Sequence, residues 1–154
     1  MSVRAVGVTL AVVVLLPVVF LAVRSAFAPG PPALGLVDGK LSPCPSTPNC
    51  VSSQAPGTSR FVEPIPFEGA PGAALERARR ALEALPRTRV VAEGPGYLRA
   101  ESTTLLFRFV DDVEVALDAP GRLLHVRSAS RTGTTDFGTN RGRVEAFRAL
   151  FARG

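Results

Sequence analysis

The sequence predicts an α+β fold: a small two-layer domain with a mainly antiparallel sheet of four to five strands and two helices on one face, preceded by an N-terminal hydrophobic helix. Three observations support this class. An uncharged apolar run opens the chain, an amphipathic helical pattern lies in its middle, and alternating strand patterns then lead to a second helical segment. With 154 residues and 46% hydrophobic content, the chain is long enough to bury one core.

The charge of the chain is weakly basic and evenly distributed. It has 18 Lys and Arg against 13 Asp and Glu, a formal net charge of +5. The cations are interleaved with anions, and no run of alternating basic and aromatic residues occurs. We therefore expect no nucleic-acid partner.

The first element is a membrane segment. Residues 6–23 contain no charged residue, and this span of 18 positions (23 − 6 + 1 = 18) is about the shortest that crosses a bilayer. We expect residues 1–28 to be an uncleaved membrane anchor. A cleaved signal peptide is the alternative, since Arg4 supplies a positive n-region and residues 26–28 resemble a small-x-small cleavage site. Pro29 directly after that site disfavours cleavage, because proline lacks the N–H and has a locked φ.

A linker and a cysteine loop follow the anchor. Residues 29–40 contain a Pro-Gly-Pro-Pro run that suits a stiff spacer, so we place the single folded domain at residues 41–154. Cys44 and Cys50, the only cysteines, should form a structural disulfide in an exported protein. A redox pair or half of a metal site is the alternative, but the spacing is not C-x-x-C and the chain has one histidine. We therefore expect a domain outside the cytoplasm, in the cell envelope, with no metal and no cofactor.

Three elements are predicted between the cysteine loop and the last strands. Residues 60–67 form an edge strand or an extended segment, because they contain two prolines. Residues 89–99 form a hairpin with a Glu-Gly-Pro-Gly turn, and its second strand extends to residue 103. Between them a helix is predicted from Pro71 to Pro86, and its apolar face consists of Leu75, Ala78, Leu82 and Leu85.

The last two predicted strands place a carboxylate in an apolar row. Residues 105–117 alternate between two faces, with Asp111 among apolar residues on one face and Asp112 on the other. An ionised carboxylate in such a row is costly unless it is paired. We therefore expect either a bulge that turns Asp111 outward or an arginine that reaches it. After a turn at residues 118–121, the strand at residues 122–131 returns.

The returning strand contains the only histidine. His125 with Ser128 or Ser130 and Asp136 would supply the residue types of a catalytic triad. In a regular strand, however, both serines face away from His125, and no G-x-S-x-G motif is present. We therefore expect a mid-strand surface histidine and assign no catalytic residue.

The candidate site is an arginine-rich turn at residues 127–145, with four arginines gathered around Asp136. Its centre is rich in Gly and Thr, and Thr139 or Asn140 is suited to cap the helix that follows. Two of the arginines would oppose the dipole of that helix. Either the arginines pair with carboxylates inside the domain, or some of them bind an anionic ligand with the helix N–H groups. The residues of this cluster are Arg127, Ser128, Ser130, Arg131, Asp136, Asn140, Arg141, Arg143, Asp111 and Asp112.

Three sequence blocks carry a resemblance to a known family. The run PCPSTPNCVSSQ, followed downstream by FRFVDDVE and RSASRTGTTDFGTNRGRVEAFR, resembles the bacterial and plant-plastid family catalogued as domain of unknown function 1499. The resemblance covers residues 41–151. It implies no activity, ligand or catalytic residue, because none is established for the family. The matching positions are Cys44, Pro45, Asn49, Cys50, Ser52, Ser53, Gln54, Asp111, Asp112, Arg127, Ser128, Ser130, Arg131, Gly133, Asp136, Gly138, Asn140, Arg141, Arg143 and Glu145.

These patterns lead to one functional hypothesis and two alternatives. The first is a membrane-tethered, extracytoplasmic, non-catalytic domain that binds a partner protein or an anionic ligand at the arginine-rich turn. The second is a hydrolase or transferase that acts on anionic envelope material, with Asp111 or Asp112 as the general base. The third is a thiol redox role for Cys44 and Cys50. A carboxylate with a raised pKa in a deep pocket would favour the enzyme, and a fully paired arginine cluster would favour the binding domain.

Overall fold

The computed structural model describes residues 12–13, 15–20, 23, 34–105 and 108–154. The predicted anchor therefore lies mostly outside the described residues, as does the candidate cleavage site. The described residues before position 24 are helical, but no helix in the described ranges is long and apolar enough to cross a membrane.

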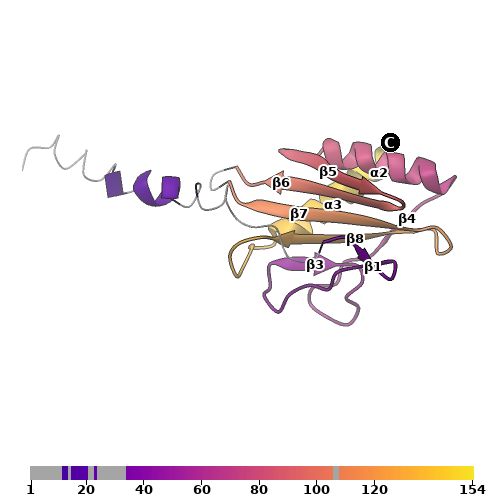
Figure 1. The fold of residues 1–154 in the computed structure, drawn as a ribbon, viewed down its shortest axis with the longest axis horizontal. Helices are drawn as coiled ribbons and strands as arrows, with labels where there is room; N and C mark the ends of the chain where they lie inside the picture. Colours follow the sequence, from indigo (N-terminus) through magenta and orange to yellow (C-terminus); the bar gives the residue numbers. More distant parts are fainter. Residues whose placement is uncertain (1–11, 14, 21–22, 24–33, 106–107) are drawn as a thin grey trace, which may run out of the picture.

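The folded part is α+β with a mainly antiparallel sheet, as predicted (Figure 1). The strands are β1 (Leu36–Val37), β2 (Lys40–Leu41), β3 (Cys50–Ser52), β4 (Ile65–Pro66), β5 (Thr88–Gly94), β6 (Tyr97–Thr103), β7 (Val110–Asp118) and β8 (Leu123–Ser130), and the helices are α2 (Pro71–Glu83) and α3 (Thr139–Arg153).

The main sheet is an antiparallel meander with a composite edge. β5, β6, β7 and β8 pair in chain order. At the outer edge of β8, β3 lies opposite residues 127–129 and β4 lies opposite residues 123–124. The described sheet therefore has six strands, above the predicted four to five, because the cysteine loop contributes β3, a strand of three residues that we did not predict. The predicted edge position of the segment at residues 60–67 is confirmed.

Helices α2 and α3 cover one face of the sheet and form its core with it (Figure 1). Val113 and Val115 of β7 point to this face and are fully buried. They pack with Ala78 and Leu82 of α2 and with Phe147 of α3. The predicted helix is confirmed, but it ends at Glu83. Of its predicted apolar face, Ala78 and Leu82 are buried within it, Leu75 is partly buried, and Leu85 is buried just beyond its end.

The opposite face of the sheet is partly covered by the segment that precedes β3. β1 and β2 form a hairpin, and the main-chain N–H of Gly35 donates to Glu114 Oε1 on β7 at 3.0 Å. The main-chain N–H of Leu41 donates to Gln54 Oε1 at 2.8 Å. Residues 36–40, which we assigned to a linker, are therefore folded against the domain.

Two boundaries near the candidate site differ from the sequence prediction. β7 begins at Val110 instead of residue 105, because Thr104 and Phe109 close a loop: the Thr104 N–H donates to the Phe109 carbonyl at 2.8 Å, and the Phe109 N–H donates to Thr104 Oγ1 at 2.9 Å. The N-cap of α3 is Gly138, not Thr139 or Asn140. Its φ of 83° lies in the left-handed region, which favours glycine.

Candidate functional site

Asp111 faces the helices, and an arginine of α3 reaches it. Asp111 is 1% exposed, and Arg143 Nη2 donates to its Oδ2 at 2.5 Å. β7 pairs in regular register with β8 here, Asp111 opposite Ser130. We predicted either a bulge that turns Asp111 outward or an arginine that reaches it. The arginine is therefore confirmed, and the bulge is wrong. The second carboxylate oxygen, Oδ1, has no hydrogen-bond partner in the described part of the chain.

A buried polar network surrounds this ion pair. Arg143 Nη1 donates to Ser128 Oγ at 3.1 Å and to Asn140 Oδ1 at 2.7 Å. Asn140 is fully buried, and its Nδ2 donates to Ser130 Oγ and to the Asn49 carbonyl, each at 2.9 Å. Because these groups come from α3, β8 and the cysteine loop, the network joins all three elements.

Asp112 lies on the opposite face and is also buried. Arg131 binds it with both oxygens engaged, Nε to Oδ2 and Nη2 to Oδ1, each at 2.8 Å. The same guanidinium donates to Glu101 Oε1, and Arg99 lies 3.6 Å from Asp112. The hydrogen bond to Asp112 raises the pKa of Arg131, although burial acts in the other direction. This cluster is an internally paired network.

Arg127 belongs to a second ion pair on that face. Its Nη1 donates to Glu114 Oε2 at 2.7 Å, and Tyr97 donates its hydroxyl proton to Glu114 Oε1 at 2.8 Å. Burial and this hydrogen bond raise the pKa of Tyr97. With the Gly35 N–H already described, both oxygens of Glu114 are occupied, and the pair fixes the β1–β2 hairpin to the sheet.

Asp136 accepts main-chain N–H groups at the start of α3 and is not surrounded by arginines. Its Oδ2 accepts the Asn140 N–H at 2.8 Å and its Oδ1 accepts the Gly138 N–H at 3.1 Å. Burial raises the pKa of Asp136, but these hydrogen bonds outweigh it, so the pKa lies below its usual value. The carboxylate at the helix N-terminus offsets the unfavourable position of the two arginines in the first turn.

Arg141 is the one arginine of the predicted cluster that binds main-chain carbonyls instead of a carboxylate in the described residues. Its guanidinium donates to the Phe61 carbonyl at 2.9 Å and to the Ser59 carbonyl at 2.8 Å. The four predicted arginines are therefore divided among two faces of the sheet and the protein surface. Our prediction that they gather around Asp136 is wrong, because strand alternation separates Arg127 and Arg131 from α3.

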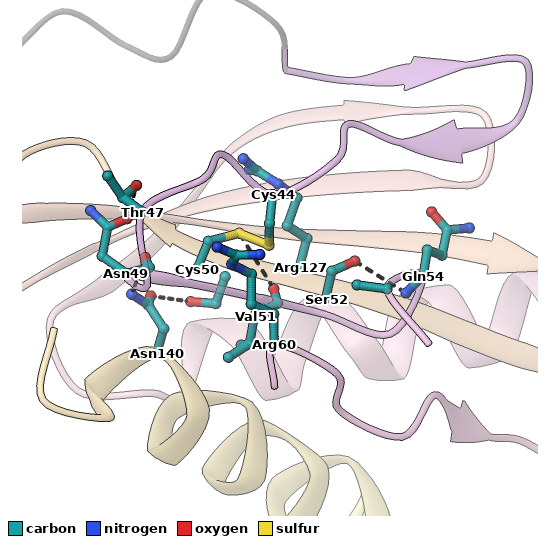
Figure 2. The surroundings of a disulfide bond; sticks show 12 residues. Cys44, Thr47, Asn49, Cys50, Val51, Ser52, Gln54, Arg60, Arg127 and Asn140 are labelled. Atoms are coloured by element: carbon teal, nitrogen blue, oxygen red, sulfur yellow. Dashed lines mark hydrogen bonds between the residues drawn. A yellow bond between two sulfur atoms is a disulfide. The ribbon is translucent and has the colours of Figure 1, made fainter. Parts of the chain in front are cut away.

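The predicted disulfide between Cys44 and Cys50 is confirmed (Figure 2). Within the loop that it closes, Asn49 makes the contacts with the arginine-rich turn. Its Nδ2 donates to the Gly133 carbonyl at 2.8 Å, and its own carbonyl accepts the N–H of Ser130 at 3.0 Å. The loop thus holds the start of the turn in place, which is a structural role.

His125 contacts a serine that we did not predict. Its Nδ1 lies 3.2 Å from Ser53 Oγ, and its Nε2 lies 4.0 Å from Asp118 Oδ2. Ser53 is buried, and its Oγ already accepts the Val126 N–H at 2.9 Å. Burial lowers the pKa of His125, against the charge of Asp118. The arrangement is not a catalytic triad, since the serine is not accessible and the Asp118 distance is too long for a hydrogen bond.

Two hollows lie on either side of the turn at residues 132–139. A cavity of about 240 Å³ lies between the turn and the sheet and is lined by Asp111. A groove of about 260 Å³ lies between the turn and the cysteine loop and is lined by Arg141. Phe137, at the tip of the turn, lines both and is 95% exposed. Among the described residues, no group of three or more His, Cys, Asp or Glu is placed to hold a metal ion.

Sequence reasoning missed most residues of these hollows. Thr104 and Phe109 line the cavity but belong to the loop between β6 and β7, whose distance from the turn depends on the sheet. Phe137 could have been found, because a phenylalanine within a run of Thr, Gly and Asp has no apolar neighbours.

A family model described as protein of unknown function (DUF1499) matches residues 40–151. The chain therefore belongs to this family, as the sequence blocks indicated. No curated protein matches the chain.

Proposed function

We propose that this protein is a membrane-tethered, extracytoplasmic, non-catalytic domain that binds a partner protein through the turn at residues 132–139. The disulfide supports the compartment, because disulfides persist mainly in oxidising environments outside the cytoplasm. The uncharged run at residues 6–23 supports the tether. The domain would then act in the cell envelope, and cleavage after residue 28 is the alternative that would release it.

The observation that carries this proposal is Phe137. It is 95% exposed, and its φ of 51° lies in the left-handed region. This backbone conformation costs a bulky residue on the order of 1 kcal/mol. Leaving the ring in water also forgoes about 1.5–3 kcal/mol of burial energy. A partner that covers the ring would recover the burial energy, and aromatic side chains buried in this way contribute strongly to the energetics of interfaces.

The turn that presents Phe137 is held on both sides. Asp136, its neighbour, accepts two main-chain N–H groups of the helix start. Asn49 donates to the Gly133 carbonyl at 2.8 Å, and Arg141 binds the segment at residues 59–61. Because the turn is already fixed, binding would cost little additional ordering.

An anionic ligand is the less favoured occupant of this turn. Arg127, Arg131 and Arg143 each have a carboxylate partner within 2.8 Å. Releasing any of them to bind an anion would leave a buried carboxylate uncompensated. Of the four arginines of the predicted cluster, only Arg141 is exposed and has neutral partners among the described residues.

The enzymatic alternative has one observation in its favour and two against it. Asp111 lines the cavity with one oxygen available. However, the cavity lining contains no His, Lys or Cys that could act as acid or nucleophile beside it. Asp112, the other predicted base, is fully buried with both oxygens bound to Arg131.

The test is site-specific photo-crosslinking in intact cells. A benzophenone amino acid replaces Phe137 in the full chain, and a matched control replaces Val37, which is 65% exposed on the β1–β2 hairpin. We expect a discrete crosslinked species with the probe at 137 and none with the probe at 37. Equal products at both positions, or none at 137, would contradict the proposal.

The tether is tested on the same material. If the anchor is retained, N-terminal sequencing should find Met1 or Ser2, and the protein should fractionate with membranes. An N-terminus at Pro29 would show that the domain is released.

A further inference from the structure

The cavity of about 240 Å³ beside Asp111 has features that the arginine network and the exposed tip of the turn do not explain. It lies where the loop between β6 and β7, the end of β8 and the turn at residues 132–139 meet. Thr104, Phe109, Asp111, Thr132 and Phe137 are among its lining residues. Its walls thus come from three segments far apart in the sequence.

Two polar atoms in the lining have no hydrogen-bond partner in the described residues. One is Oδ1 of Asp111, a residue that is 1% exposed, and the other is Oγ1 of Thr132. An unsatisfied buried polar atom costs about 1–3 kcal/mol, and more if it is charged. A ligand that supplies hydrogen bonds to both atoms would remove that cost.

The charge of the lining excludes an anion and gives no excess attraction for a cation. No residue that lines the cavity is positively charged, and two lining residues are carboxylates. The carboxylate of Asp111 is already compensated by Arg143, and that of Asp136 by the N–H groups at the start of α3. The charges are therefore satisfied, while Asp111 still has an oxygen that can accept a hydrogen bond. A neutral donor, such as a hydroxyl group, fits this state.

The rest of the lining is rich in hydroxyl groups and contains two aromatic rings. Thr104, Ser130, Thr132, Thr135 and Thr139 contribute the hydroxyls, which can both donate and accept. Phe109 and Phe137 contribute the rings, which can pack against the C–H face of a small ring. A ligand that matches this lining has hydroxyl groups together with an apolar C–H face, and a sugar combines the two.

We propose that this cavity binds a small neutral polyhydroxylated molecule, a monosaccharide or one sugar unit of a glycan. Asp111 Oδ1 accepts from one ligand hydroxyl, Thr132 Oγ1 exchanges a hydrogen bond with another, and Phe137 covers the open side. The inference goes beyond the protein-binding function and does not depend on it, because it rests on Asp111 and Thr132.

The test is saturation-transfer NMR of the purified full chain in a detergent without a sugar head group. The probes are glucose, galactose, mannose and N-acetylglucosamine, with acetate and propylamine as an anionic and a cationic control. We expect at least one sugar to receive saturation from the protein. Neither acetate nor propylamine should receive it.

Matched variants locate the binding. Thr132→Val keeps the shape of the side chain and removes the unpartnered hydroxyl, so sugar affinity should fall about tenfold. Thr134→Val makes the same change in the same turn at an exposed residue outside the cavity lining and should leave affinity unchanged. Asp111→Asn should weaken binding further, and it is scored only if its circular dichroism spectrum is that of the wild type.

The outcomes separate this inference from the protein-binding function. Sugar binding that Thr132→Val weakens supports the cavity, whatever the crosslinking at position 137 shows. No saturation of any sugar, binding of acetate or propylamine in its place, or equal affinity in the Thr132 and Thr134 variants would overturn it.

Discussion

The two faces of the sheet hold their buried carboxylates in different ways. On the face opposite the helices, Asp112 and Glu114 have both oxygens hydrogen bonded. On the helix face, Asp111 binds Arg143 through one oxygen and leaves the other beside a cavity. Asp111 and Asp112 are adjacent in the sequence, so strand alternation alone separates a fully paired carboxylate from one with an unpaired oxygen. Burial therefore does not by itself distinguish the two carboxylates, whereas incomplete pairing does, because an unsatisfied buried oxygen calls for an explanation.

The largest expected effect is the loss of the closed network. Glu114→Gln removes the negative charge that compensates Arg127, and it places an amide NH₂ group beside groups that donate hydrogen bonds to Glu114 in the wild type. The free energy of unfolding should therefore fall by about 3–5 kcal/mol. Urea denaturation measures this. Glu145→Gln is the control, since its side chain is 55% exposed in a surface pair with Arg148, and it should change stability by less than about 1 kcal/mol. A similar small effect for both variants would mean that the buried pair is not a structural element.

Asp111→Asn should have a smaller effect on stability. In the variant, Arg143 keeps Ser128 and Asn140 as acceptors, and one amide atom takes the position of Oδ1, which has no partner in the wild type. We therefore expect the free energy of unfolding to fall by about 2 kcal/mol. Thermal and urea unfolding of the two variants side by side give the comparison. A loss equal to that of Glu114→Gln would remove the distinction between the two faces, and unchanged stability would place Asp111 outside the core network.

The smallest effect is a pH dependence due to His125. Burial lowers its pKa in the folded state, so below its ordinary value of 6.5 the unfolded chain binds more protons than the folded one. Stability should therefore fall as the pH decreases through about 6.5 and be constant above it with respect to this group. His125→Gln should reduce the loss between pH 7.5 and pH 5.5, by less than about 1 kcal/mol. Denaturation at both pH values, with wild type beside the variant, checks the sign. An equal loss in both proteins would show that other groups cause the dependence.

Local patterns predicted the elements and one key contact. The period-two alternation of β7 placed Asp111 in an apolar row, and the cost of burying a charge required a partner. Which arginine supplies it could not be predicted, because Arg143 reaches Asp111 only through the packing of α3 on the sheet. The expected grouping around Asp136 was wrong for a local reason: main-chain N–H groups two and four residues ahead reach the carboxylate first.

The cavity and the folded position of residues 36–40 were beyond sequence reasoning. The cavity depends on three segments whose separation is set by the sheet, and no sequence period encodes that distance. β1 and β2 are two residues each, too short for an alternation to be detected, and main-chain hydrogen bonds to the side chains of Glu114 and Gln54 hold them against the domain. The disulfide was predictable because both cysteines lie in one short loop.

The pairing of β3 with β8 implies an order of assembly along the chain. The strands from β5 to β8 are neighbours along the chain, so each can pair soon after it emerges. β3 must wait, because Cys50 lies opposite Ala129, 79 residues later (129 − 50 = 79). The ring between Cys44 and Cys50, with a separation of 6, can close long before that. The closed ring would then hold Asn49 in position before the turn at residues 132–139 has been synthesised. The disulfide thus prepares the contacts through which the cysteine loop later binds the turn and α3.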